Sequence, residues 1–425
     1  MTRPLAPTAN AAWRRSALLL LIAVGLCNFV DRLCMSVLSV PIRQELSLTD
    51  AQIGILTGLA FSLVYTFGAV PIAALADRGS RKRVLVWCLA VWSLVTAACG
   101  LATGFAILAV LRMLVALGEA GCVPATQAIL SEYFPREQRA RALTAWQLVF
   151  PVGAMLGFWL SGYLNDAVGW RATFVILGAG GLVLVPVVLC CLREPPRHVS
   201  ASDSLPRGFA ALSSAVRSLC SEPALRMLLV AGGLMAYPLN AALYWSGQFY
   251  ARVFQLELAD LAWRLAVLTG VAGVLGLLLG GWCADRLGQG NARRMLWVPG
   301  IAGIVAAPSM LLQYFAESAT VSLLGGFLTL LMLNAFMPPQ AAAVQALASP
   351  AHRALAAALI VLVSGTVGTA AGPFLTGLTS DWLARRYGMG SESLRWAIGG
   401  ASALALLGGI GFLAAARHYA IALRR

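Results

Sequence analysis

Charged residues are scarce in this sequence of 425 residues: Asp, Glu, Lys and Arg together make up 11% of it, whereas 60% of its residues are hydrophobic. A soluble domain does not have this composition, and intrinsic disorder has the opposite one. A membrane-spanning helix needs about 20 apolar residues, so a chain of this length with ordinary loops holds roughly ten to thirteen of them. The composition therefore predicts an all-α integral membrane protein and excludes one with a large soluble domain.

Lysine and histidine are rarer still. Lys82 is the only lysine and follows Arg81, so no GK phosphate-binding motif exists, and the chain alone cannot be an ATP-driven pump. His198, His352 and His418 fall in predicted loops or at the tail. With no HExxH, CxxC or GxSxG motif either, we expect no metal, no cofactor and no enzyme activity. A membrane enzyme or a non-transporting sensor is the alternative from a different class.

The net charge of +14 would suggest nucleic-acid binding in a soluble protein. Here most basic residues fall on one side of the predicted membrane, which is the positive-inside bias that orients membrane proteins. We therefore expect no nucleic-acid partner, a multi-pass protein of the plasma (inner) membrane, and both termini in the cytoplasm.

Apolar runs bounded by charges predict twelve spans. The first is uncleaved, because its apolar run continues past Asp31 and no small-residue cleavage pattern closes it. The longest polar segment, 193–224, is the predicted cytoplasmic linker between two six-helix bundles, residues 1–192 and 225–425. The spans are residues 17–40, 51–75, 84–103, 105–131, 141–165, 171–192, 225–250, 262–284, 294–315, 318–346, 354–380 and 394–416.

The two predicted bundles share short motifs in the same order. Ala76-Asp77-Arg78 and the basic cluster after it are matched by Ala284-Asp285-Arg286 and the cluster after that. Arg141-Ala142-Leu143 is likewise matched by Arg353-Ala354-Leu355. Matching elements on one membrane side indicate a parallel repeat, a common way to build a transporter. The two bundles are therefore predicted to be pseudo-symmetric.

Four charges fall in the interior of predicted spans, away from the span ends: Asp31, Arg32, Arg112 and Glu119. Each costs on the order of 3 kcal/mol at a helix centre. Arg112 and Glu119 share one helix face, and Asn28 shares a helical turn with Asp31 and Arg32. A buried structural ion-pair network, or an Arg112 that snorkels to the interface, is one explanation. The functional one makes Glu119 and Asp31 the proton-coupling acids, and Arg32, Arg112 and Asn28 substrate ligands.

Polar aromatic residues recur along span 225–250 at helical spacing. They form either an interface belt or the lining of a cavity, and mid-span Asn240 and Tyr244 favour the cavity. In span 318–346, Asn334 precedes Pro338 and Pro339, which predicts a broken helix that either gates or packs. The further substrate-binding candidates are Gln147, Tyr237, Asn240, Tyr244, Trp245, Asn334 and Phe336. Gln248 belongs to the same stripe, and Phe61, Tyr65 and Phe150 are weaker candidates.

The loop from Asp77 to Arg83 is either a topogenic anchor or a latch. Asp77 closes a helix, and Arg81 and Arg83 follow a short Gly-Ser turn. The acid can then bridge to a base or a neighbouring helix end on the cytoplasmic side. The predicted gating residues are Asp77, Arg78, Arg81, Arg83, Asp285 and Arg286.

This same loop resembles the cytoplasmic signature of the major facilitator superfamily, although Ala73 stands where that family usually has Gly. The motifs from Asn28 to Arg32, at Gly118-Glu119-Ala120 and at Tyr133-Phe134-Pro135 resemble a branch that holds Spinster-like and proton-coupled organic-anion transporters, and the first half is most similar to bacterial Spinster-like members. The resemblance implies the fold of that superfamily, with a central cavity lined by spans one, four, seven and ten and two halves that rock about it.

Taken together, these features predict a secondary active transporter that works by alternating access and is coupled to protons. All four membrane charges lie in the first half, and the second half offers aromatic side chains, Met and Asn. That division suits a solute with an anionic or zwitterionic head and an apolar body. The Spinster resemblance implies a lysophospholipid or sphingoid phosphate. The alternatives are a small organic anion, such as a sugar acid or aromatic carboxylate, and a hydrophobic drug. The other expected partners are protons and membrane lipids, and the expected state is a monomer.

Overall fold

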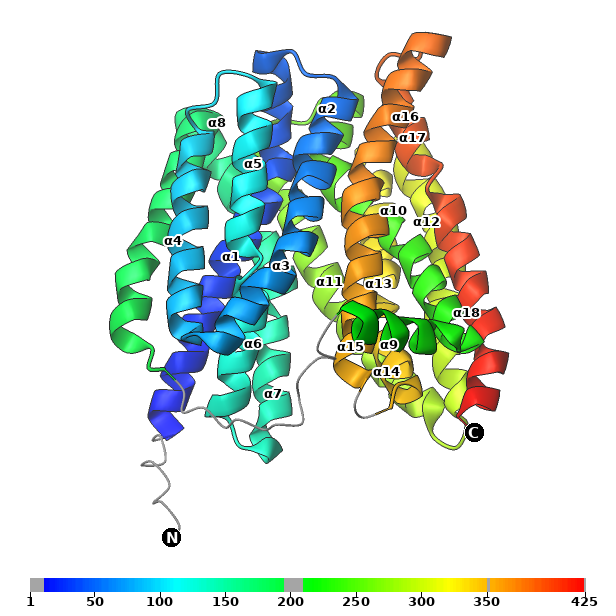
Figure 1. Cartoon of the computed structure of the whole chain (residues 1–425). Helices are drawn as coiled ribbons and strands as arrows, with labels where there is room; N and C mark the ends of the chain where they lie inside the picture. The colour runs from blue at the N-terminus through cyan, green and yellow to red at the C-terminus, as the bar shows by residue number, and fades with distance from the viewer. Residues whose placement is uncertain (1–10, 195–208, 350–351, 424–425) are drawn as a thin grey trace. The chain divides into compact units, whose positions relative to one another are not determined.

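A computed structural model describes residues 11–194, 209–349 and 352–423 of the chain, and this part is helical without a strand (Figure 1). Eleven of its helices are long and apolar enough to cross a membrane. One of them, Arg141–Cys191, has 51 residues. At 1.5 Å per residue it would be about 77 Å long, over twice the hydrocarbon thickness. Gly169, at φ +78°, breaks it between the predicted spans 141–165 and 171–192. The helices are thus consistent with twelve spans.

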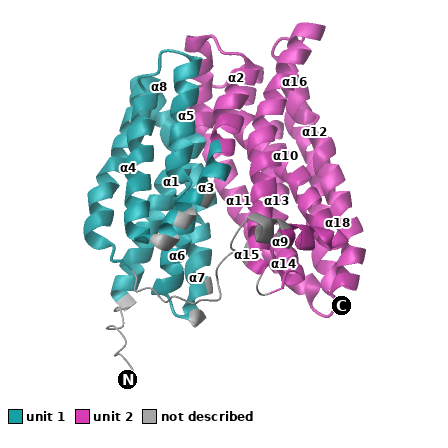
Figure 2. Ribbon diagram, viewed as in Figure 1, with its two compact units in different colours: residues 1–34, 64–199 teal, residues 35–63, 200–425 magenta. Residues whose placement is uncertain are grey.

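Contacts divide the chain into two compact units (Figure 2). Unit 1 comprises Met1–Cys34 and Val64–Val199, and unit 2 comprises Met35–Leu63 and Ser200–Arg425. The segment 35–63 therefore groups with the later part of the chain. The predicted bundles, 1–192 and 225–425, follow from the sequence repeat and not from contacts, so that boundary stays a prediction.

Unit 1 holds the helices that carry the four predicted membrane charges. Gly118 allows α5 to approach α4, because a Cβ there would lie 2.8 Å from the backbone N of Trp92. The helix then breaks at Ala120 and Gly121, directly after Glu119. The helices of unit 1 are α1 (Ala11–Leu46, which ends in unit 2), α3 (Ala60–Arg78, which begins in unit 2), α4 (Arg81–Cys99), α5 (Phe105–Glu119), α6 (Cys122–Tyr133), α7 (Arg136–Gln147) and α8 (Val149–Cys191).

Unit 2 contains the remaining helices and two π-helical segments. The helix predicted over 318–346 is broken at Phe336, just before Pro338 and Pro339, as predicted. The elements are α2 (Asp50–Gly54), the π-helix η1 (Ile55–Leu59), α9 (Phe209–Ser221), α10 (Pro223–Val253), α11 (Leu258–Gly288), the 3₁₀ helix η2 (Ala292–Leu296), α12 (Trp297–Phe315), α13 (Ala319–Ala335), α14 (Met337–Leu347), α15 (Arg353–Val363), the π-helix η4 (Ser364–Ala371), α16 (Gly372–Tyr387), α17 (Glu392–Gly399) and α18 (Ser402–Ala422).

Candidate substrate and proton site

An ion pair between α1 and α5 lies at the centre of the charged cluster in unit 1. Arg32 Nη2 lies 3.0 Å and Nε 3.2 Å from the same oxygen of Glu119, Oε2. The Glu119 side chain is fully buried, and that of Arg32 is 14% exposed. Both nitrogens donate to one carboxylate oxygen, while Glu119 Oε1 has no hydrogen-bond partner among the described residues. The pair thus involves only one of the two oxygens of a buried acid.

Asp31 and Arg112 are also buried, each with 1% of its surface exposed. Thr96 Oγ1 on α4 lies 3.5 Å from Asp31 Oδ2, and Arg112 Nη1 lies 3.5 Å from the backbone carbonyl of Asp31. These long contacts place two acids and two arginines within one helical unit. The alternative of Arg112 at the interface does not agree with its burial.

Asn28 is fully buried one turn before Asp31 on α1. Its side-chain amide lies beside the Glu119 carboxylate, which is its polar neighbour, although the two groups do not reach full hydrogen-bond geometry. Buried amides in folded proteins are almost always hydrogen-bonded, and an unmet one costs about 1 to 3 kcal/mol. A polar ligand that reaches Asn28 would therefore complete its hydrogen bonding and compete with Glu119 for the amide.

Aromatic rings surround the Arg32 guanidinium. Its Cζ lies 4.5 Å from the ring centroid of Tyr65 and 5.2 Å from that of Phe29, both within the range of cation–π attraction. Phe150 packs edge-on against Phe29, with ring centroids 5.3 Å apart. Tyr65 and Phe150 are among the weaker substrate-binding candidates from the sequence. The structure places Tyr65 against Arg32 and Phe150 against Phe29. Gln147, at the end of α7, is exposed and makes no described contact with the cluster.

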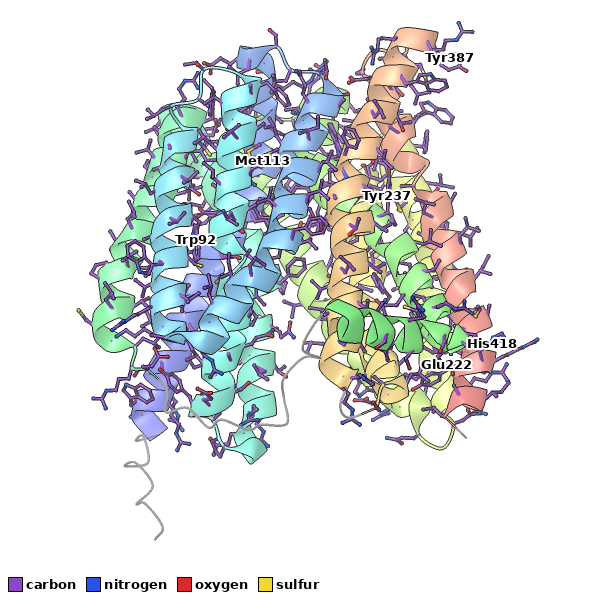
Figure 3. The ribbon with its side chains drawn as sticks, viewed as in Figure 1. Trp92, Met113, Glu222, Tyr237, Tyr387 and His418 are labelled. Atoms are coloured by element: carbon purple, nitrogen blue, oxygen red, sulfur yellow. The ribbon has the colours of Figure 1, made fainter. Side chains whose placement is uncertain are left out.

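In unit 2, Tyr237 and Asn240 of the predicted stripe on α10 face the π-helix η4 and the start of α16. Asn240 Oδ1 accepts a hydrogen bond from Thr369 Oγ1 at 3.2 Å, and Tyr237 Oη lies 3.2 Å from Thr376 Oγ1 (Tyr237 is labelled in Figure 3). The π-helix widens the backbone spiral, and such segments are frequent at functional sites. Thr369 and Thr376 are polar neighbours that no sequence pattern singled out.

Other predicted substrate contacts in unit 2 lie inside helix packing. Trp245 is fully buried and donates from Nε1 to the carbonyl of Pro373 at 3.0 Å. Phe336 packs against Phe412, with centroids 6.2 Å apart. Asn334 donates to the carbonyl of Leu330 at 2.7 Å. Tyr244, Gln248 and Phe61 are buried too. Their role as substrate ligands stays a prediction.

The predicted gating loop makes contacts within unit 1. Arg81 forms an ion pair with Glu132 at the end of α6. Glu194, after α8, accepts from the backbone N–H groups of Arg81 at 2.9 Å and Lys82 at 3.1 Å. An acid at the first turn of α4 is favoured by the helix dipole. Arg83, Asp285 and Arg286 are exposed, and the side chains of Asp77 and Arg78 lie outside the described residues.

A second buried charge network, in unit 2, was missed by sequence reasoning. Asp50, at the start of α2, is 3% exposed. Its carboxylate accepts hydrogen bonds from both terminal nitrogens of the Arg252 guanidinium, Nη1 to Oδ2 at 2.9 Å and Nη2 to Oδ1 at 2.6 Å. Ser380 donates to Asp50 at 2.7 Å, and Arg43 lies 3.2 Å from it. Asp381 accepts from the backbone N–H groups of Asp50 at 3.0 Å and Ala51 at 2.8 Å. The network fastens the start of α2 to α10 and α16.

Comparison with known proteins agrees with this helical architecture. The sequence profile of the Major Facilitator Superfamily matches residues 20–373. The chain belongs to this superfamily. It is therefore a multi-pass membrane transporter of that type, and the resemblance drawn from the loop at Asp77 to Arg83 is confirmed.

The comparisons also identify the branch within the superfamily. An MFS-type efflux pump of Mycolicibacterium smegmatis is 32% identical over 379 residues, 88% of this chain and 85% of that protein. Protein spinster homolog 1 of Xenopus tropicalis is 26% identical, and the match covers 94% of this chain and 80% of that protein. A crystal structure of a bacterial homolog to the human lysosomal transporter Spinster, inward-facing and unoccupied, is 26% identical with a TM-score of 0.87, and the match covers 97% of this chain and 99% of that one. The Spinster-like resemblance is thus confirmed.

Proposed function

We propose that this member of the superfamily is a proton-coupled secondary active transporter that works by alternating access and moves an amphipathic, lipid-like solute such as a lysophospholipid or a sphingoid phosphate. The observation that carries the proposal is the buried pair of Arg32 and Glu119, with Asp31, Arg112 and Asn28 around it. Glu119 is the proton-coupling acid, and Asp31 organises the arginines.

Competition for an arginine supports the coupling. Glu119 and an anionic head group both need Arg32, which can form its two-pronged hydrogen bonds with only one carboxylate or phosphate at a time. A head group that takes Arg32 leaves Glu119 buried without its partner, and a buried carboxylate without a partner is costly unless it takes up a proton. Substrate binding and protonation of Glu119 are therefore linked.

The surroundings of Arg32 support an amphipathic solute. Tyr65 and Phe29 provide apolar surface directly beside the guanidinium, and Phe150 extends it behind Phe29. Asn28 adds an amide next to Glu119. Such a combination of few polar groups and adjacent aromatic surface is typical of small-molecule sites.

A hydrophobic drug exporter is the second candidate function, because the relative that is 32% identical is described as an MFS-type efflux pump. A cationic drug would pair with Glu119 or Asp31 and leave Arg32 unused, whereas an anionic lipid requires Arg32. The two candidates therefore differ in their dependence on Arg32.

The deciding experiment is uptake into vesicles that contain the purified full-length protein, with and without an imposed pH gradient. The probes are lysophosphatidylethanolamine, sphingosine 1-phosphate, D-glucarate and ethidium. Flux of the lipid probes that responds to the gradient supports the proposal. Flux of ethidium alone selects the exporter, and flux of glucarate alone selects a small organic anion.

Replacing Arg32 tests the head-group assignment. Arg32→Lys keeps the charge but loses the planar fork, and we expect about tenfold weaker binding of a lipid phosphate, since one charge-assisted hydrogen bond contributes about 1.5 kcal/mol. Arg32→Gln loses the charge as well and should bind more weakly still. Titration of intrinsic fluorescence with sphingosine 1-phosphate measures both. Unchanged affinity in both variants would move the head-group site to Asn240 and Tyr244 in unit 2.

Topology is a separate expectation. We expect the linker 193–224 on the cytoplasmic face, so a cysteine introduced at Ser202 should not react in intact cells with a membrane-impermeant maleimide. The native cysteines are first replaced, because Cys190 and Cys191 are exposed. Permeabilised cells provide the positive control. Labelling of Ser202→Cys in intact cells would reverse the predicted orientation.

The Asp50 network is proposed as the contact that must open during alternating access. Helix α1 begins in unit 1 and ends in unit 2, and α3 begins in unit 2 and ends in unit 1. A movement of one unit therefore has to displace the segment 35–63 or bend it. Arg252, Ser380 and Asp381 bind this segment to α10 and α16. The π-helix η1 within this segment is a suitable point of bending.

A further inference from the structure

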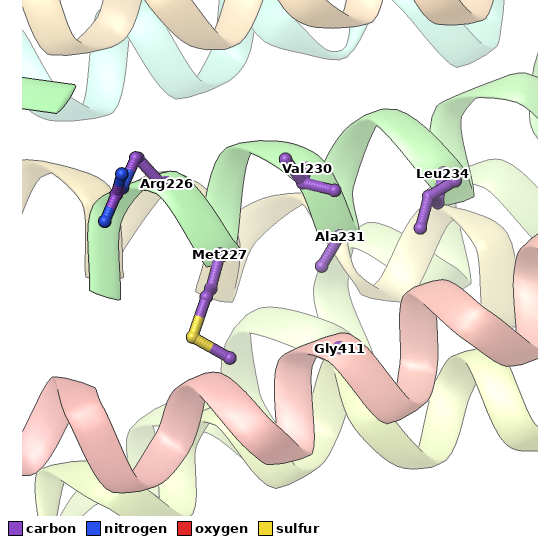
Figure 4. Close-up of a pocket in the computed structure, with 6 residues that line it drawn as sticks. All are labelled: Arg226, Met227, Val230, Ala231, Leu234 and Gly411. Carbon is purple, nitrogen blue, oxygen red and sulfur yellow. The ribbon is translucent and has the colours of Figure 1, made fainter. Parts of the chain in front are cut away.

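A groove on the surface of unit 2 has no part in the site described above. It has a volume of about 280 Å³ and lies between α10 and α18 (Figure 4). Its lining consists of Arg226, Met227, Val230, Ala231 and Leu234 from α10 and Gly411 from α18. Apart from Arg226 at one end, every lining residue is apolar. Val230 is 61% exposed, so the groove is open to the surroundings of the helices.

The groove has the length of an acyl chain segment in one leaflet. From Arg226 to Leu234 the helix rises by about 12 Å, while one leaflet contributes about 15 Å of hydrocarbon. Gly411 lets α18 approach α10 closely at the bottom of the groove, because a Cβ there would lie 3.1 Å from the Cβ of Ala231. A larger side chain at position 411 would fill it.

Positive charge is concentrated at one end of the groove. Arg226 is exposed in the first turn of α10, which begins at Pro223, and the partial positive charge of a helix N-terminus points the same way. The nearby acid, Glu222, is the N-cap of this helix and accepts from the backbone N–H of Ala224 at 3.5 Å. Figure 3 shows His418 of α18 at the same end of the unit. This is also the end next to the predicted cytoplasmic linker.

We propose that this groove binds an anionic glycerophospholipid, with one acyl chain along α10 and the phosphate at Arg226. Basic pockets between membrane helices on the cytoplasmic side bind anionic head groups. Apolar walls alone would accept any lipid, but the arginine selects for negative charge. The occupant is thus a membrane lipid held at the outside of unit 2, distinct from the transported solute at Arg32.

The test uses the delipidated full-length protein in detergent and measures its thermal unfolding midpoint as phosphatidylglycerol or phosphatidylcholine with the same acyl chains is added. We expect phosphatidylglycerol to raise the midpoint at lower concentration. Arg226→Gln should weaken the apparent affinity for phosphatidylglycerol about fivefold, the equivalent of about 1 kcal/mol for one basic residue near the surface, and leave phosphatidylcholine unchanged. Gly411→Leu should reduce the response to both lipids.

Arg264→Gln is the matched control, because Arg264 is an exposed arginine of unit 2 whose partner, Asp260, is exposed as well. It should respond to both lipids as the wild type does. The proposal is overturned if the wild type responds equally to the two lipids. It is also overturned if Arg226→Gln and Gly411→Leu both keep the wild-type response to phosphatidylglycerol.

Discussion

Glu119→Gln should abolish the response of substrate flux to an imposed pH gradient while substrate still binds. Glutamine has the shape of a protonated glutamate and cannot release a proton. A gradient of one pH unit supplies about 1.4 kcal/mol for each coupled proton, which supports about tenfold accumulation of the solute. The wild type should approach that ratio in vesicles. Glu119→Gln should only equilibrate the solute across the membrane.

A second variant, Asp31→Asn, distinguishes the role of Glu119 from that of Asp31. Asp31→Asn removes a buried charge beside Arg112 and Arg32, so we expect both binding and transport to fall, because the arginines are free to reorient. Glu119→Gln should instead retain binding, or bind more tightly, since Arg32 loses its charged partner and the head group no longer competes with a carboxylate. If Glu119→Gln vesicles accumulate solute with the wild-type dependence on the gradient, Glu119 is not the coupling acid. A facilitator or a sodium-coupled transporter then becomes the better description.

The sequence predicted the cluster in unit 1 well because its signal is a property of single residues. A charge within an apolar span is costly wherever it lies, so Asp31, Arg32, Arg112 and Glu119 were visible without a structure. Helical periodicity then placed Arg112 and Glu119 on one face. The ion pair between Arg32 and Glu119 joins residues 87 positions apart, and periodicity within one helix does not determine such pairing.

The network at Asp50 shows where sequence reasoning failed. Thr49-Asp50-Ala51-Gln52 is a typical helix start, and Thr49 and Gln52 do form a capping box. Asp50 therefore had an ordinary local explanation as an acid in a first helical turn. Its partner Arg252 lies 202 positions away, at the end of a predicted span, where an arginine is expected to orient the protein. Only the packing of α2 beside α10 and α16 brings these charges together.

Removal of this network should cause the largest loss of stability in unit 2. The side chains of Asp50 and Arg252 are 4% and 15% exposed, and the loss of one partner of such a buried pair costs on the order of 3 kcal/mol. We expect Asp50→Asn and Arg252→Gln each to lower the unfolding midpoint of the purified protein by several degrees. Ser380→Ala should cost about 1 kcal/mol, the contribution of one hydrogen bond. Arg43 is 37% exposed, and its replacement should cost less than 1 kcal/mol.

The double variant Asp50→Asn/Arg252→Gln distinguishes the stability that comes from the ion pair itself from the stability that comes from its other neighbours. If Asp50 and Arg252 stabilise each other directly, the combined variant should be more stable than the sum of the two single losses predicts, because neither charge is left buried alone. Asp260→Asn provides the control, since its pair with Arg264 is exposed and should contribute no more than about 0.5 kcal/mol. Additive losses would assign the stabilisation to Ser380 and Arg43 instead. If the Asp50 and Arg252 variants unfold at the same midpoint as the Asp260→Asn control, Asp50 and Arg252 do not hold the segment 35–63 in place. The proposal that the Asp50 network opens during transport would then be wrong.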